Sequence, residues 1–198
     1  MPWCGRAMRR AFMNQASHYV DMIQWLVGPV ESVVARTATL ARRIESEDTG
    51  IALLHFRNGA LGTIEVTMLA YPRNMEGSIT IIGERGTVKV GGTALNRIDN
   101  WEFAEYDDID REAELLKAAP NPLSVYGSGH KPYYENVVRA LRHEAAADTD
   151  GREGRKSLEL ILAIYESARS EHQIALPLRT FSRDPDAAAA IGGGGRRR

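Results

Sequence analysis

The sequence of 198 residues has little cysteine, little excess charge and no long apolar run, and each shortage excludes a class of protein. The single cysteine, Cys4, excludes a disulfide framework and a zinc site built from several cysteines. A formal net charge of -1 favours neither nucleic-acid binding nor attachment to an anionic membrane. No apolar run approaches the roughly 18 residues of a transmembrane helix, and no apolar stretch of a signal peptide follows the basic start. We therefore expect a globular protein of the reducing cytoplasm.

Several catalytic signatures are also missing from the sequence. No G-x-G-x-x-G fingerprint follows a strand pattern, and neither a phosphate-binding P-loop nor an H-E-x-x-H zinc motif occurs. The G-x-S-x-G turn of serine hydrolases is missing too. His18 and Asp21 have a spacing that suits two metal ligands on one helix face, but no further ligand has a recognisable spacing. We predict no metal site.

The sequence does contain a pattern of one helix, then several strands, then two helices. The first helix pattern covers residues 13–27 and stops at Gly28-Pro29. Runs rich in β-branched residues follow, and in one of them Ile64, Val66 and Met68 alternate with polar residues, as in a half-exposed strand. Strands are predicted over residues 30–40, 48–56, 61–69, 78–82, 87–90 and 96–103, and the later helices over residues 133–144 and 155–171.

This order of elements predicts an α+β fold, a predominantly antiparallel, open-faced sheet with helices packed on one face. Short turns such as Asn58-Gly59 favour antiparallel pairing. The other face of the sheet, which carries Thr63 and Glu65 among apolar neighbours, either pairs with another subunit or is an ordinary solvated face. We expect an irregular arm over residues 1–11, the α+β domain over residues 12–180 and a disordered low-complexity tail over residues 181–198.

The first helix pattern has an unusual polar face. At about 100° per residue, one narrow stripe collects an amide, an imidazole, a carboxylate and an indole, from Asn14, His18, Asp21 and Trp25. Solvated helix faces usually carry long charged side chains instead. His18 is the candidate general acid/base, because an imidazole suits proton transfer near neutral pH. Asp21 either takes part in catalysis or is a simple orienting or salt-bridging residue, and Trp25 is expected to pack.

The chain from residue 12 reads F-M-N-Q-A-S-H-Y-V-D-M-I-Q-W-L-V-G-P-V-E-S-V, and D-T-G-I-A-L-L-H-F-R-N-G-A-L-G-T-I-E-V-T and G-S-I-T-I-I-G-E-R-G-T-V-K-V follow in order. This series resembles the C-terminal domain of the Gfo/Idh/MocA oxidoreductases over residues 12 to about 180. The motifs M-N-Q-A-S-H, T-M-L-A-Y-P-R-N-M-E-G-S and S-V-Y-G-S-G-H-K-P-Y-Y are most similar to the branch that oxidises UDP-N-acetyl-glucosaminuronate at C3.

The resemblance implies a domain of the dihydrodipicolinate-reductase-like type, which in the family follows an N-terminal Rossmann domain that is missing here. NAD is the implied cofactor, and the missing domain would hold it. A nucleotide-sugar or other sugar is the implied substrate, and a homo-oligomer through the open sheet face the implied assembly. His18 would handle the hydroxyl proton together with a lysine of the missing domain. The start also departs from the family, since C-G-R-A-M-R-R-A stands where a glycine-rich loop is usual.

The same resemblance suggests further substrate-binding residues. Asn14 can donate to a sugar hydroxyl or acetamido group, while Gln15, about 100° away, reaches either substrate or solvent. Arg73 stands at a strand end, where it can meet a carboxylate, a diphosphate or only solvent. Tyr126 and His130, in a loop rich in Gly and Pro, either contact a nucleotide-sugar or pack the loop against the sheet.

The expected function is therefore that of the substrate-binding domain of an NAD-dependent sugar dehydrogenase, inactive by itself. Two alternatives remain open at this point. One is a non-catalytic sheet domain that only oligomerises. The other is a dehydrogenase that acts on another sugar or polyol, such as inositol.

Overall fold

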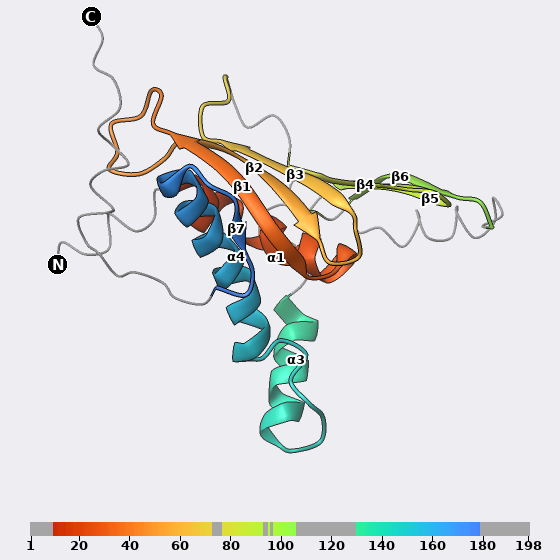
Figure 1. Cartoon of the computed structure of the whole chain (residues 1–198). Helices are drawn as coiled ribbons and strands as arrows, with labels where there is room; N and C mark the ends of the chain where they lie inside the picture. The colour runs from red at the N-terminus through yellow and green to blue at the C-terminus, as the bar shows by residue number, and fades with distance from the viewer. Residues whose placement is uncertain (1–9, 73–76, 93–94, 96, 106–129, 179–198) are drawn as a thin grey trace, which may run out of the picture. The chain divides into compact units, whose positions relative to one another are not determined.

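The computed structural model describes residues 10–72, 77–92, 95, 97–105 and 130–178 (Figure 1). The chain divides into two compact units. Unit 1 takes the chain up to Ala70 and from Thr149 onward, and unit 2 takes Tyr71–Asp148. The domain predicted over residues 12–180 stays a prediction, as do the arm and the tail, most of whose residues lie outside the described ones.

Unit 1 is built on a four-stranded antiparallel sheet with the strand order β3-β2-β1-β7 (Figure 1). The central strands β1 (Val30–Ala38) and β2 (Thr49–Phe56) pair along almost their whole length. The outer strands are β3 (Leu61–Thr67), beside β2, and the short β7 (Ile174–Ala175), beside β1. The antiparallel pairing confirms the α+β class that the sequence predicts.

Helices α1 (Ser17–Val27) and α4 (Gly151–Ser170) supply the other layer of unit 1, and a five-residue π-helix, η2 (Ala11–Gln15), precedes α1. Every second residue of β2 is buried, so within the described part of unit 1 the helices cover one face of the sheet. The core between sheet and helices consists of apolar side chains from all these elements: Phe12, Ala16, Val20, Val30, Val33, Ala35, Ala52, Leu54, Phe56, Ile64, Leu160, Ile161, Ala163 and Ile164.

Helix α4 begins earlier than its apolar pattern predicts. The sequence predicts a helix from residue 155, but the structure is helical from Gly151. The Asp150 carboxylate accepts hydrogen bonds from the backbone N–H groups of Arg152 at 2.8 Å and Glu153 at 3.0 Å. This N-cap satisfies donors that the first helical turn leaves free, so the helix extends up to it.

Unit 2 contains a three-stranded antiparallel sheet with the order β4-β5-β6 and the helix α3. The strands are β4 (Ile79–Gly83), β5 (Gly86–Gly91) and β6 (Arg97–Phe103), and α3 is His130–Leu141. Within the described part of the chain, the strands therefore pair in two sheets, one in each unit. Residues 68–78 join β3 to β4 instead of the short turn that a hairpin between these strands would need.

No helix among the described residues is long and apolar enough to cross a bilayer.

Candidate functional site

Three of the predicted site residues lie together where η2 passes into α1. Asn14 and Gln15 belong to η2, and His18 lies in the first turn of α1. All three are exposed. The structure therefore presents an amide pair and an imidazole on one short, accessible segment of unit 1.

The prediction of one continuous α-helix from Met13 is wrong for its first turn. The Ala16 N–H donates to the Ala11 carbonyl oxygen at 3.0 Å, a bond that spans five residues and defines a π-helical turn. Ala16 joins this turn to α1 with φ -99° and ψ -4°. Single π-helical turns are frequent at functional sites, since the extra residue redirects the side chains beside it. The position of Asn14 relative to His18 is therefore set by this π-helical turn, and not by the regular spacing of an α-helix.

A buried ring anchors the segment beneath these polar residues. Phe12 is completely buried, and its ring contacts Tyr165 of α4 edge to face with the centroids 6.4 Å apart. On its other side lies Gly50 of β2, where an added Cβ would stand 2.2 Å from the Phe12 ring. Because Gly50 leaves this space, the segment can lie close against the sheet while Asn14 and Gln15 face outward.

The His18 imidazole lies against the Tyr19 ring, with the two centroids 4.3 Å apart. Although His18 remains accessible, the surrounding protein removes part of the water from its ring, and this partial desolvation lowers the pKa of His18 below its ordinary value. A lowered pKa keeps the imidazole neutral at physiological pH. A neutral imidazole is the form that can accept a proton from a substrate hydroxyl.

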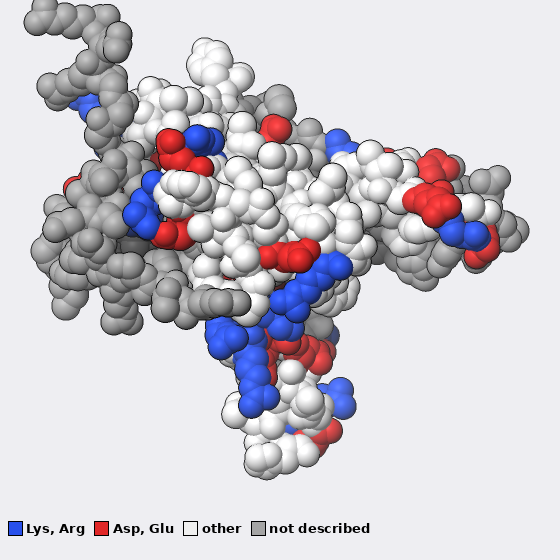
Figure 2. All heavy atoms as spheres, in the orientation of Figure 1, with Lys and Arg blue, Asp and Glu red and all other residues white. Residues whose placement is uncertain are grey.

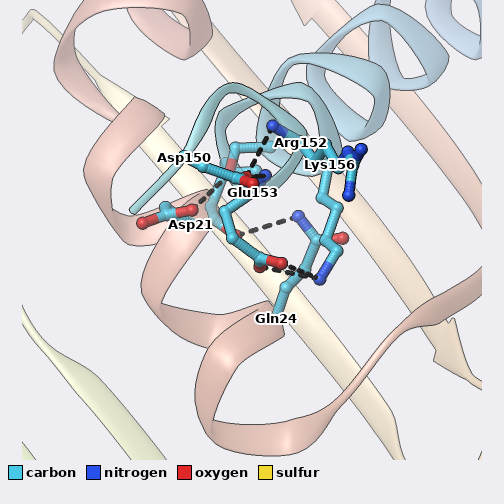
Figure 3. Close-up of polar contacts among 8 residues, drawn as sticks. Asp21, Gln24, Asp150, Arg152, Glu153 and Lys156 are labelled. Atoms are coloured by element: carbon cyan, nitrogen blue, oxygen red, sulfur yellow. Dashed lines mark hydrogen bonds and ion pairs between the residues drawn. The ribbon is translucent and has the colours of Figure 1, made fainter. Parts of the chain in front are cut away.

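Asp21 is directed toward α4. The Ser157 hydroxyl donates a hydrogen bond to its carboxylate. Figure 3 shows Asp21 beside the first turn of α4, which Asp150 caps. Among the described residues His18 makes no hydrogen bond to Asp21. A catalytic role for Asp21 stays a prediction, and the contact that this carboxylate makes here joins two helices.

The far end of the predicted stripe is exposed. Gln24 donates back to the Val20 carbonyl oxygen at 3.4 Å within α1 (Figure 3). Trp25 is 82% exposed, so the expectation that it packs is wrong. The reason is that α1 turns the side bearing Ala16 and Val20 toward the core, and Trp25 lies away from that side.

The remaining predicted substrate-binding residues belong to unit 2 or lie outside the described residues. His130 is the first residue of α3 in unit 2, and it is exposed. Arg73 and Tyr126 lie outside the described residues. No three His, Cys, Asp or Glu side chains are grouped so that they could hold a metal ion within the described part of the chain. The substrate-binding roles of these residues stay predictions.

Unit 1 is thus an antiparallel sheet with helices on one face and polar residues exposed where the first helix begins. Residues 8–176 match the oxidoreductase family described as the C-terminal alpha/beta domain of Gfo/Idh/MocA. The chain belongs to this family. The family predicted from the motifs is thereby confirmed.

Two solved structures are similar to the chain in both sequence and fold. One is the WlbA dehydrogenase from Bordetella pertussis, in complex with NADH and UDP-GlcNAcA, which is 59% identical with a TM-score of 0.78. The match covers 90% of this chain and 51% of that one. The WlbA dehydrogenase from Chromobacterium violaceum, with the same two ligands, is 54% identical with a TM-score of 0.79, and the match covers 91% of this chain and 50% of that one.

A more distant relative is a D-apiose dehydrogenase from Rhizobium rhizogenes, 24% identical over 170 residues. The match covers 84% of this chain and 49% of the relative. The chain therefore spans about half the length of the dehydrogenases that it matches. The two WlbA structures also support the branch that the motifs indicate.

Proposed function

We propose that this chain is the substrate-binding half of an NAD-dependent dehydrogenase that oxidises C3 of a UDP-N-acetylaminosugar uronate. The observation that carries the proposal is the identity of 59% to a dehydrogenase solved with NADH and UDP-GlcNAcA. The exposed residues Asn14, Gln15 and His18 agree with this substrate, because amides and an imidazole can bind sugar hydroxyl and acetamido groups.

In this proposed reaction, the chain itself accepts the proton of the substrate hydroxyl. NAD accepts hydride in a dehydrogenase of this kind. The described residues do not fit the cofactor, since none of their strands leads through a glycine-rich turn into a helix that could receive its pyrophosphate. As the C3 alcohol becomes a ketone, its hydroxyl proton must go to a base. Neutral His18 can take that proton at an imidazole nitrogen.

A direct test supplies the other half of the enzyme. The chain is fused behind the N-terminal half of the Bordetella pertussis dehydrogenase, and NADH formation is followed with NAD and UDP-GlcNAcA. The fusion is expected to turn over, and the chain alone to form no NADH. NADH formation by the chain alone would show that it needs no other half. A fusion that binds NAD but neither binds nor oxidises this substrate would refute the proposed substrate.

The role of His18 is tested in the same fusion. His18→Asn is expected to lower kcat by about 10²- to 10⁴-fold, the usual contribution of a general base, while UDP-GlcNAcA still binds. His143→Asn is the matched control, because His143 is an exposed histidine outside the predicted site. An unchanged kcat in His18→Asn would remove this residue from the mechanism.

We also propose that the open face of the unit 1 sheet pairs with a second copy of the chain. The supporting observation is a group of exposed apolar side chains on that face: Val34, Ile51, Leu53 and Leu61. Exposed apolar patches of this kind mark association surfaces. Figure 2 shows mostly uncharged surface over the strands of unit 1, while side chains of both charges lie together at the start of α4.

A further inference from the structure

A buried carboxylate lies just before β2, beneath the segment that carries the candidate site. Glu47 is 3% exposed. Its Oε1 accepts hydrogen bonds from the Tyr165 hydroxyl at 2.8 Å and from the Phe12 N–H at 3.1 Å. Its main-chain oxygen accepts a third, from the Ala11 N–H at 3.3 Å. Glu47 therefore binds the first two residues of η2 through both its backbone and its side chain.

Tyr165 extends this contact to the next residue of η2. The Met13 N–H donates to the Tyr165 hydroxyl oxygen at 3.2 Å, while the same hydroxyl donates to Glu47. Burial, and next the negative charge of Glu47, raise the pKa of Tyr165, so the hydroxyl keeps its proton and remains a donor. The Arg10 guanidinium lies 5.5 Å from the centre of the Tyr165 ring.

These contacts satisfy donors that a helix cannot satisfy by itself. The first N–H groups of any helix have no partner within it, and a negative charge near them is favourable. Here the N–H groups of Ala11, Phe12 and Met13 all bond to Glu47 or Tyr165. The next two residues are Asn14 and Gln15, and α1 begins two residues later.

We infer that Glu47 and Tyr165 are positioning residues, which set the π-helical turn that presents Asn14, Gln15 and His18 to the substrate. Phe12 already supplies the apolar anchor of this segment, and a buried carboxylate is costly to desolvate. The carboxylate and the phenol add what an apolar pair lacks, fixed side-chain acceptors for two successive N–H groups, those of Phe12 and Met13. The link to substrate rests on the proposed function, but the local geometry does not.

The first test measures local geometry in the complete chain without substrate. Amide hydrogen exchange and the ring signals of His18 are followed by NMR in Glu47→Gln and Tyr165→Phe. Exchange at Met13 in Tyr165→Phe, and at Phe12 in Glu47→Gln, is expected to accelerate about fivefold, the factor that one average hydrogen bond is worth, while amides of β2 stay protected. The His18 ring signals are expected to shift.

The matched controls remove similar groups elsewhere. Glu159→Gln alters a carboxylate that accepts the Leu178 N–H at 2.9 Å, and Tyr133→Phe alters an exposed tyrosine of α3. Both are expected to leave Met13 and His18 unchanged. Tyr165→Phe keeps the Glu47 carboxylate, so it remains informative if Glu47→Gln does not fold. Unchanged signals at Met13 and His18, or equal acceleration across all of unit 1, would overturn the inference.

The second test uses the fused dehydrogenase. Tyr165→Phe is expected to lower kcat/KM for UDP-GlcNAcA by about tenfold beyond any effect of Glu159→Gln, if each variant is assayed well below its Tm. Altered exchange with an unchanged kcat/KM would overturn the link to substrate. A parent fusion without turnover on this substrate would instead refute the proposed function, and the exchange experiment would still decide whether Glu47 and Tyr165 set the turn.

Discussion

The two faces of the unit 1 sheet carry similar apolar residues in opposite surroundings. Val33 is 1% exposed, whereas its neighbour Val34 is 41% exposed, because successive side chains of a strand point to opposite faces. Leu54 and Leu53 repeat the contrast on β2. The covered face is therefore expected to determine the stability of the fold. The open face is expected to determine association.

The polar groups of the two faces also differ in how deeply they are buried. On the covered side, the Ser167 hydroxyl accepts the Ala35 N–H at 2.9 Å and donates to the His172 carbonyl oxygen at 2.6 Å. On the open side, Glu31 lies 3.1 Å from His55, and both side chains are about half exposed. Exposed ion pairs contribute little to stability, whereas unpairing a buried group is costly.

The largest effect is expected from the anchor of the covered face. Phe12→Ala should lower the free energy of unfolding by about 3–5 kcal/mol, because it removes a fully buried ring between Gly50 and Tyr165. Denaturant unfolding measures the change. Leu61→Ala, at a residue 81% exposed, is the control and should change the free energy by less than about 0.5 kcal/mol. Equal effects of the two variants would contradict the comparison.

A smaller effect, dependent on pH, is expected from Asp48. Although burial opposes its charge, backbone hydrogen bonds from Ala41, Arg42 and Leu40 prevail and lower the pKa of Asp48. Because the folded pKa is the lower one, the stabilisation is complete above the unfolded pKa and is lost as the pH falls through the folded pKa.

Asp48→Asn should therefore lower stability by about 1–3 kcal/mol at neutral pH and by less in acid. Unfolding curves at several pH values measure this difference. Glu31→Gln changes a carboxylate of the open face and should stay within about 0.5 kcal/mol of the parent at neutral pH. A cost for Asp48→Asn that does not change with pH would contradict the assignment.

The smallest effect on stability is expected where the effect on association is largest. Leu53→Lys on the open face should change the free energy of unfolding by less than about 0.5 kcal/mol, yet abolish self-association, because a charge would be buried between the two copies. Analytical ultracentrifugation gives the oligomeric state. Glu84→Lys, in the turn between β4 and β5, controls for charge. An unchanged oligomer in Leu53→Lys would show that the open face is not the interface.

Local signals predicted much of the secondary structure. The β-branched runs, the alternation at Ile64 and Val66 and the turn at Asn58-Gly59 placed β1, β2 and β3 within a few residues. The N-cap at Asp150 was missed because an apolar pattern does not register a capping carboxylate. Contacts that depend on distant residues were missed altogether. Nothing near Asp21 in the sequence indicates its bond to Ser157, which is 136 residues away.

The sequence by itself determined the α+β class, the family and the identity of the polar residues around His18, because periodicity and motifs are properties of neighbouring residues. Only the tertiary structure decided that the described strands pair in two sheets, that Trp25 is exposed and that the first turn of the predicted helix is a π-helix. The physical reason is that these features depend on contacts between residues that are far apart in the sequence. Glu47 and Tyr165 come from distant parts of the chain, and together they hold the N–H groups from which η2 begins.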